Sequence, residues 1–309
     1  MSKVDTRVPR YNELMNPLFA ALKTLGGSGS NNEILNQVIK DLAIPDEVVD
    51  ILHGDRQNMT ELSYQLNWAK TYLKKYGILT NNERGVWAIK PECMSLETLD
   101  EKMIVTDVVQ KTRKQRQVEK EKLATEFDPI TVGIPFTDDP PLTDDDPAND
   151  GVDTPDEMKP WREMLAYILQ HMDPYGFERL AQRILRECSF SDVQVTQKSG
   201  DGGIDGYGKL SINGIFSLNV AFQCKRYKGS VGAGEIRDFR GSLPTNIEKG
   251  VMITTGTFSK AARDEACSPG KQQIDLIDGE ALIDIIAKYQ IGVKPVITYE
   301  IDEEFFAQI

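Results

Sequence analysis

The sequence is poor in cysteine and histidine, and it has no long hydrophobic run. Its 309 residues include four cysteines and two histidines, and no two cysteines form a CxxC pair. This scarcity argues against a zinc knuckle or a disulfide framework and is typical of a reducing, cytoplasmic compartment. No stretch of 18 or more apolar residues occurs, and the first ten residues are largely polar, so neither a membrane span nor a signal peptide is expected.

Acidic side chains outnumber basic ones, 48 to 36, so the formal net charge is −12. Much of this acidity lies in one segment, since residues 128–159 hold ten acidic side chains and one basic side chain. Residues 101–127, in contrast, hold seven basic and five acidic side chains. The folded parts are therefore expected to be near neutral, and the global charge neither supports nor excludes binding to a polyanion.

Residues 1–100 have the pattern of a small, mainly helical domain. Apolar residues recur at helical spacing from Tyr11 to Leu22, and a Gly/Ser-rich loop separates this helix from the next one. A later helix carries an apolar face from Leu62 to Leu73 and ends at Gly77. The segment ILTNNERGVWAI that follows predicts a short hairpin. This order of elements predicts a winged helix-turn-helix domain.

Several cations of this domain are candidate DNA contacts. Lys70, Lys74 and Lys75 are expected to lie off the apolar face of the helix that precedes the hairpin. In a winged helix such a helix enters the major groove while lysines contact phosphates, but a solvated helix face explains the same three residues. Arg84, at the tip of the predicted hairpin, is either a wing contact to DNA or an ordinary polar turn residue.

Residues 101–159 are expected to connect two domains. Their first part is a charged, helical connector, and their second part is rich in Asp and Pro, with few large apolar side chains after Phe136. Such a composition cannot bury enough apolar surface to order itself, so a flexible linker is predicted. The linker is either a spacer or an acidic segment that competes with DNA for a basic surface.

Residues 160–309 predict a second domain of the α/β class. The segment GFERLAQRILREC places apolar residues on one stripe of a helix, and strand patterns then alternate with helical ones. The sequence therefore predicts a mixed central sheet flanked by helices.

The segment from Gly200 to Lys225 holds the polar residues around which this domain is organised. Asp205 lies in a glycine-rich bend, and Gln223 lies 18 residues later, at the end of an apolar strand pattern. This separation fits two strands and a turn, so the end of the second strand should return beside Asp205. Gln223 and Lys225 are two residues apart, and their side chains should therefore point to the same face.

These residue types suit phosphodiester hydrolysis, which needs a hard cation with oxygen ligands. Asp205 supplies charge, Gln223 and the Cys224 carbonyl supply neutral oxygens, and Lys225 can stabilise developing negative charge. Glu178, on the preceding helix, would add an acid if its side chain faces the hairpin. Each residue also has a structural interpretation: Asp205 as a turn former, Lys225 as a solvated strand end and Glu178 as an ordinary helix acid.

Residues 175–292 resemble the catalytic domain of the Mrr family of type IV restriction endonucleases, within the PD-(D/E)xK superfamily. The blocks that carry the resemblance are YGFERLAQRIL, GDGGIDG, FQCKRYKG, EIRDFRGSL, GVMITTGTFSKAARDEA and LIDGEALIDII. The resemblance implies a restriction-endonuclease-like fold and a Mg²⁺-dependent cleavage centre, with Mn²⁺ as an alternative cofactor. The implied residues are Glu178, Asp205, Gln223 and Lys225, of which the first three would hold the metal. Gln223 stands where the superfamily commonly has a second acid.

The N-terminal region is similar to the winged-helix Mrr N-terminal domain, with weaker motifs. The whole layout implies an enzyme whose N-terminal domain binds double-stranded DNA and whose C-terminal domain cuts it. Its implied substrate is foreign DNA with modified bases. A catalytically silent DNA-binding regulator and a nuclease for structured repair intermediates are the alternatives. Double-strand cleavage needs two centres, so a homodimer or higher homo-oligomer is expected.

Further phosphate contacts are expected around the cleavage centre. Thr254 and Ser259 lie where a strand passes into a helix N-terminus, where helix capping is the alternative. Lys198, Arg226 and Lys228 flank the centre, where surface solvation explains them equally well.

Two arginines follow the strand that carries Gln223. Arg237 and Arg240 lie on the next predicted helix and are either structural or dimer-facing.

Overall fold

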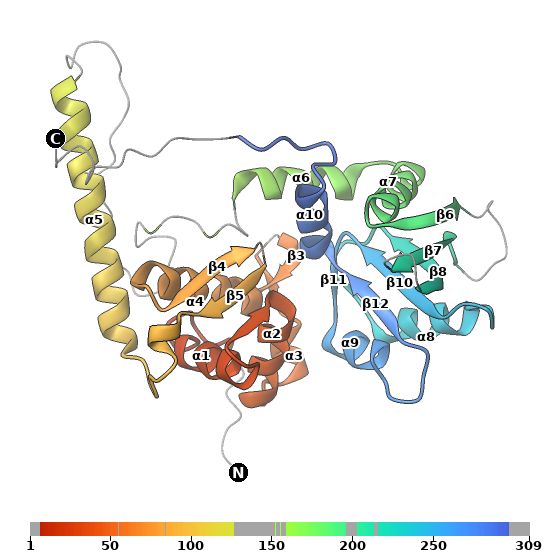
Figure 1. The fold of residues 1–309 in the computed structure, drawn as a ribbon, viewed down its shortest axis with the longest axis horizontal. Coiled ribbons are helices and arrows are strands. Elements are labelled where there is room, and N and C mark those ends of the chain that lie inside the picture. The colour runs from red at the N-terminus through yellow and green to blue at the C-terminus, as the bar shows by residue number, and fades with distance from the viewer. Residues whose placement is uncertain are drawn as a thin grey trace.

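The computed structural model describes residues 7–54, 56–83, 85–126, 152, 155, 159–195, 203–212 and 216–296. Two domains lie side by side, with α5 on the outer side of the first one (Figure 1). Within the described residues, no helix is both long and apolar enough to cross a membrane.

The N-terminal domain has the element order of a winged helix-turn-helix, as the sequence predicts. Its elements are α1 (Met15–Thr24), β1 (Ser28–Ser30), α2 (Asn31–Asp41), α3 (Asp46–Val49), β2 (Leu52–His53), β3 (Arg56–Thr60), α4 (Glu61–Tyr76), β4 (Leu79–Glu83), β5 (Val86–Ile89) and the 3-10 turn η1 (Pro91–Cys93). The predicted hairpin, β4–β5, and β1 form one antiparallel sheet in the order β1-β5-β4.

Local signals fix the ends of the two helices of the helix-turn-helix. A capping box starts α2, because Ser30 accepts from the Glu33 backbone N–H and Glu33 accepts from the Ser30 backbone N–H. Thr60 caps α4 through the Ser63 backbone N–H, and Gly77 ends α4 with a φ of 102°. Only glycine adopts that left-handed conformation without strain.

The connector helix, α5 (Glu101–Glu126), is partly a piece of the N-terminal domain. Ile104, Val108 and Val109 are buried in the same cluster as Trp68 and Tyr72 of α4. The helix expected over residues 100–127 is therefore present, and its first half packs on the N-terminal core instead of crossing solvent. The acidic residues 128–151 lie outside the described residues.

The C-terminal domain is built on a mixed five-stranded sheet in the order β12-β10-β8-β7-β6. Strand β10 is parallel to β8 and β12, whereas β8, β7 and β6 are antiparallel neighbours. Its elements are α6 (Pro160–His171), α7 (Pro174–Glu187), β6 (Phe190–Val195), β7 (Gly206–Ile212), β8 (Phe216–Lys225), β9 (Ser230–Val231), α8 (Ala233–Ser242), β10 (Lys249–Thr254), β11 (Thr257–Phe258), α9 (Lys260–Ala266), β12 (Ile274–Ile277) and α10 (Gly279–Lys288).

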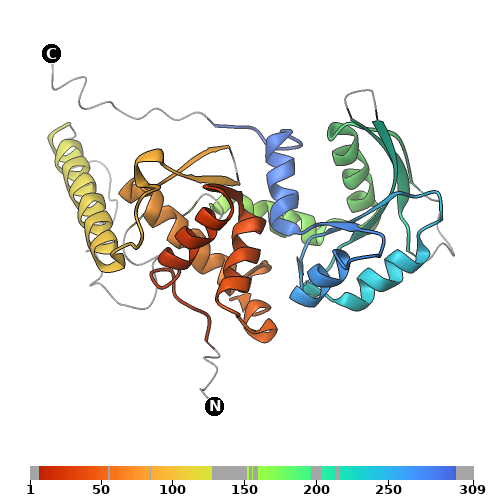
Figure 2. The same cartoon turned by 60° about the horizontal axis from the view of Figure 1, so that its bottom comes forward.

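Helices cover both faces of this sheet (Figures 1 and 2). Phe222 of β8 packs into the core beneath α6, α7 and α10, and its neighbour Ala221 packs into the core beneath α8 and α9. Consecutive residues of a strand point to opposite faces, so a strand covered on both sides needs an unbroken apolar run. This accounts for the apolar segment that leads to Gln223.

Candidate active site

The β7–β8 hairpin places Asp205 beside the end of β8. Gly206 pairs with Phe222 in the antiparallel register, and the Asp205 backbone N–H donates to the Phe222 carbonyl at 3.0 Å. The Asp205 carboxylate accepts from the Cys224 backbone N–H, with 2.6 Å between Oδ2 and N. Two contacts, one from the backbone and one from the side chain, therefore fix the carboxylate next to Gln223.

The glycine bend before β7 makes room for the Gln223 amide. Gly203 has a φ of +90°, and a Cβ at this position would lie 2.3 Å from Gln223 Nε2. Residues 201 and 202 of the bend lie outside the described residues. At Gly203, both the backbone conformation and the approach of the Gln223 side chain require glycine.

The carbonyl oxygen of Gln223 is the unusual atom of this site. Oε1 is buried, and within the described part of the chain no hydrogen-bond donor contacts it. Buried acceptors are nearly always paired, because a buried oxygen without a donor or cation is costly. An unpaired amide oxygen on the strand whose next backbone N–H, that of Cys224, holds the Asp205 carboxylate offers oxygen ligands that suit Mg²⁺ or another hard cation.

Glu178 approaches this hairpin from α7. Its neighbours Phe177 and Ala181 are buried in the core under α7, while Glu178 itself is half-buried. Burial first, and then the charges of Asp205 and Glu178, raise the pKa of the Cys224 thiol well above its ordinary value. Both carboxylates thus act electrostatically on one point at the end of β8.

Lys225 is the last residue of β8 and lies on the same face of the strand as Gln223. Its side chain is half-buried, and its carbonyl accepts from the Thr254 hydroxyl at 2.9 Å. The ends of β8 and β10 are therefore tied together directly behind the candidate site.

The described residues contain no group of three or more His, Cys, Asp or Glu side chains that could hold a metal ion. Among the described residues, the acidic side chains assigned to the candidate site are Glu178 and Asp205. Any cation here would depend on the Gln223 oxygen as well as on carboxylates.

The residues expected to contact phosphates around this centre have different environments. The Thr254 side chain is fully buried, and its hydroxyl also accepts from the Gly256 backbone N–H, so the expected exposure to a phosphate is absent. Ser259 caps α9 through the Ala262 backbone N–H at 3.1 Å, which is the capping alternative. Arg226 donates to the Met172 carbonyl at 2.8 Å, Lys228 is exposed, and Lys198 lies outside the described residues.

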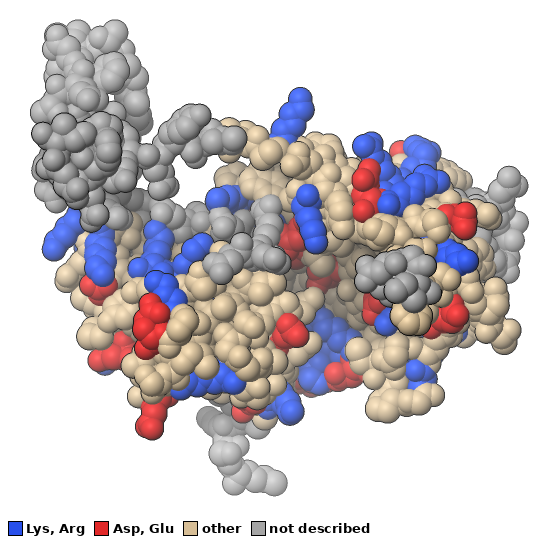
Figure 3. All heavy atoms as spheres, in the orientation of Figure 1, with Lys and Arg blue, Asp and Glu red and all other residues tan. Residues whose placement is uncertain are grey.

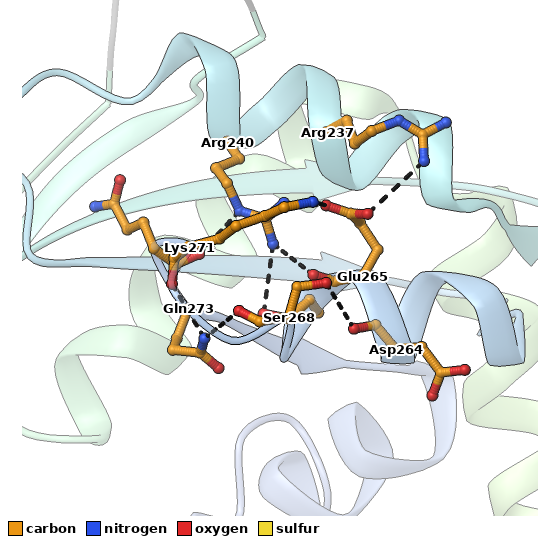
Figure 4. Close-up of polar contacts among 9 residues, drawn as sticks. Arg237, Arg240, Asp264, Glu265, Ser268, Lys271 and Gln273 are labelled. Carbon is orange, nitrogen blue, oxygen red and sulfur yellow. Dashed lines mark hydrogen bonds and ion pairs between the residues drawn. The ribbon is translucent and has the colours of Figure 1, made fainter.

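Arg240 ties α8 to α9 and to the loop that follows α9 (Figure 4). Its guanidinium donates to the Glu265 carboxylate and to the carbonyls of Glu265 and Gln272, the last at 2.9 Å. Arg237 lies 3.8 Å from the Glu265 carboxylate and is more exposed. Of the two sequence interpretations, the structural one describes Arg240.

Lys70 of the N-terminal domain does not lie on an exposed face, and that expectation is wrong. Its side chain is 3% exposed, its Nζ donates to Asn31 Oδ1 at 2.5 Å, and it lies 5.3 Å from the centroid of the Trp87 ring. Lys74 and Lys75, one turn further along α4, are exposed as expected. Arg84 lies outside the described residues.

A polar seam between the two domains is the feature that the sequence interpretation missed. Arg162 is 2% exposed and binds Glu280 at 2.6 Å and Asp284 at 2.8 Å, while its buried Nε has no hydrogen-bond partner in the part of the chain that the structure describes. A cavity of about 100 Å³ lies there, lined by α2 and α4 on one side and by Arg162 and α10 on the other. Figure 3 shows the seam as a hollow with acidic and basic side chains around it.

The signal for this seam in the sequence is weak. Glu280 and Asp284 have the i, i+4 spacing of one helix face, but Arg162 lies more than a hundred residues earlier. Nothing in the sequence pattern links those acids to Arg162 or to the N-terminal domain.

Comparisons with known proteins agree with the fold class of both domains. Residues 169–286 match the family described as a restriction endonuclease, Mrr_cat, and residues 11–97 match the Mrr N-terminal domain. The chain is 27% identical over 307 residues to the type IV methyl-directed restriction enzyme EcoKMrr of Escherichia coli (strain K12), covering 93% of this chain and 94% of that protein.

Two other similarities cover less of the chain. An uncharacterized mitochondrial protein of Schizosaccharomyces pombe is 35% identical over 91 residues, which are 28% of this chain and 36% of that protein. The solved structure of the DNA modification-dependent restriction endonuclease AspBHI overlaps 44% of this chain and 37% of its own, at 20% identity and a TM-score of 0.37. That overlap is too partial to carry an argument. On the two domain matches and the relative of nearly full length, the chain belongs to the Mrr family of restriction endonucleases.

Proposed function

We propose that this restriction endonuclease hydrolyses phosphodiester bonds of modified double-stranded DNA at the end of β8, with Mg²⁺ as its cofactor. The observation that carries the proposal is the buried Gln223 Oε1, which has no hydrogen-bond partner among the described residues, on the strand end where the Cys224 N–H holds the Asp205 carboxylate. The type IV methyl-directed relative supports methylated DNA as the substrate class.

Asp205 and Gln223 would hold the cation, with Glu178 adding a second carboxylate from α7. Such a cation polarises the scissile phosphate and lowers the pKa of an attacking water. The Cys224 backbone N–H orients the Asp205 carboxylate, so the ligand needs little rearrangement before a substrate arrives. The Lys225 ammonium would stabilise the negative charge that develops on the phosphoryl oxygens.

The Cys224 thiol is in its neutral form before a cation binds. A thiol must lose its proton to act as a nucleophile or as a metal ligand. Burial, followed by the carboxylates of Asp205 and Glu178, raises the pKa of Cys224 well above its ordinary value and keeps the thiol neutral. The contact that Cys224 makes with the proposed ligands is its backbone N–H to the Asp205 carboxylate.

DNA binding is assigned to the winged-helix domain and to the exposed cations near the centre. Lys74 and Lys75 of α4 and Arg226 and Lys228 after β8 are exposed and suit phosphate contacts. A homodimer would supply the two centres that double-strand cleavage needs. A cytoplasmic location would suit an enzyme that meets incoming DNA.

A plasmid assay tests this function. We expect Mg²⁺-dependent cleavage of methylated plasmids and weaker cleavage, or none, of the unmethylated ones. Retained DNA binding with no cleavage of any plasmid would indicate the catalytically silent regulator instead. Preferential cleavage of forks and junctions over methylated duplexes would indicate a nuclease for repair intermediates.

A further inference from the structure

The face of α4 that would enter a DNA groove lies toward the C-terminal domain. Nine of the 16 residues of α4 are buried, including the polar residues Asn67 (6% exposed) and Lys70 (3% exposed). Ser63, Asn67 and Lys70 are spaced at i, i+4 and i+7 and so share one face of the helix. Lys70 is covered within its own domain by Asn31 and Trp87. All three residues line the cavity between the domains, so the C-terminal domain stands in front of this face, and the face cannot enter a major groove while the domains stay in contact.

The opposite wall of that cavity belongs to the C-terminal domain. It is formed by Arg162 and Arg263 together with the acidic residues Asp278, Glu280 and Asp284 at the N-terminal part of α10. The Glu280 carboxylate of this wall accepts from the Asn58 side-chain amide of the N-terminal domain, and side-chain amides are among the groups that contact DNA phosphates.

Direct contacts hold the two walls together. Asn58 Nδ2 donates to Glu280 Oε1 at 2.6 Å, and the Lys260 backbone N–H donates to Asp50 Oδ1 at 2.9 Å. Lys260 Nζ also lies 3.3 Å from the Asp46 carboxylate. The two domains approach so closely here that a Cβ at Gly279 would lie 3.0 Å from the Cβ of Asn58.

This contact is polar and separable. One apolar cluster contains residues up to Val152, the other two begin at Ala166 and Ile204, and among the described residues none of the three spans both domains. Domains joined by a polar contact, without a shared apolar core, move relative to each other by default.

We propose that the α10 edge of the C-terminal domain covers the DNA-reading face of α4, so that DNA binding through α4 and this domain contact exclude each other. The inference rests on the proposed function, because it takes α4 as the helix that reads DNA. The contact is an autoinhibitory device: the enzyme is closed without DNA, and DNA opens it by competing for the same face. Because DNA then binds only the open form, weakening the contact tightens DNA binding, by at most the factor by which the closed form loses stability.

The first test follows the domain distance in the full chain. Donor and acceptor dyes are attached through E92C and D238C, which replace exposed residues of the two domains, in a C267S background. Energy transfer is measured without Mg²⁺ while a short methylated duplex is titrated. We expect the transfer to fall in proportion to bound DNA. Unchanged transfer with DNA bound overturns the inference, whereas no binding to any duplex contradicts the proposed function instead.

The second test weakens the contact directly. The variant N58D/K260E places carboxylates against Glu280 and Asp46. Its matched control, N36D/K249E, makes the same charge changes at the exposed Asn36 and at Lys249, whose ammonium pairs with Asp275 away from the seam. Relative to this control, we expect lower transfer without DNA and about 5- to 10-fold tighter DNA binding. Lower transfer with equal or weaker binding overturns the inference, as does unchanged transfer with unchanged affinity.

Discussion

The candidate active site and the helix that faces DNA are built in opposite ways. Asp205 and Gln223 are brought together by one hairpin, whose two strands lie next to each other in the sequence. The environment of α4 is set instead by α2, β5 and a domain that begins about a hundred residues later. A local element carries its geometry in its own sequence, whereas the surroundings of α4 depend on distant contacts.

The largest effect is expected from Asp205→Ala. Losing this carboxylate should lower the cleavage rate about a thousandfold or more, because a charge at the reacting centre is removed. DNA affinity should change little, since binding is spread over many phosphate contacts. The matched control is Asp238→Ala, at an exposed position of α8, which should cut normally. Full cleavage by the Asp205→Ala protein would show that the active site does not lie at the hairpin.

Gly203→Ala tests whether the bend itself holds the site. A Cβ would lie 2.3 Å from Gln223 Nε2 on a backbone with a φ of +90°, so the amide must move. We expect cleavage to fall on the order of a hundredfold and stability to fall by about 1–3 kcal/mol.

Gly234→Ala is the matched control for Gly203→Ala. It adds the same methyl group in α8, where nothing lies within 4 Å of the new Cβ. It should keep activity and stability, measured by cleavage kinetics and thermal denaturation. Equal behaviour of the two variants would show that the bend does not position Gln223.

Lys70→Ala and Lys75→Ala separate a buried lysine from an exposed one on the same helix. Lys70 is 3% exposed and bound to Asn31, so its removal should destabilise the chain by about 1–3 kcal/mol. Lys75→Ala should change stability by no more than about 0.5 kcal/mol and should lower the salt dependence of DNA binding by about one phosphate contact. Denaturant melts and binding at several salt concentrations measure both, and a stable Lys70→Ala protein would contradict the burial argument.

Glu280→Gln should change how stability depends on pH. Burial raises the pKa of Glu280 from 4.5 to about 7, and the Arg162 guanidinium opposes that shift. The native chain therefore holds this proton more tightly than the unfolded chain, and the stability that comes from the neutral form is lost as pH rises from 4.5 to about 7. Arg162, Asp278, Asp284 and Asn58 are the charged and hydrogen-bonding groups around it.

The measurement is the difference in unfolding free energy between the wild type and Glu280→Gln. Because glutamine does not titrate, raising the pH from about 5 to about 8 should lower the unfolding free energy of the wild type, relative to that of Glu280→Gln, by about 1–3 kcal/mol. A difference that stays constant across that range would show that Glu280 keeps its ordinary pKa in the folded chain.

The same contrast explains which features of the fold and the site can be predicted from the sequence. The hairpin, its register and the approach of Asp205 to Gln223 follow from strand patterns and a glycine bend, which are local signals. The winged-helix order of the N-terminal domain follows from helix caps and the hairpin segment for the same reason.

Burial by distant segments is what the sequence does not reveal. Lys70 looks like a surface residue because its neighbours along α4 do not show that Asn31 and Trp87 cover it. Thr254 has the sequence position of a phosphate contact, but its hydroxyl donates to the Lys225 carbonyl at the end of β8. Arg162 has no local partner at all, because Glu280 and Asp284 lie on the last helix of the domain.

The most direct test of the site is metal binding without DNA, measured by titration of the full chain with Mn²⁺ and magnetic resonance detection of the free ion. Asp205 and the buried oxygen of Gln223 are proposed to share one cation. The wild type should bind one tight ion per chain, Gln223→Leu should bind it more weakly, and Asp205→Ala should lose it, while Asp238→Ala should match the wild type. Equal Mn²⁺ binding by the wild type and Asp205→Ala would contradict the account.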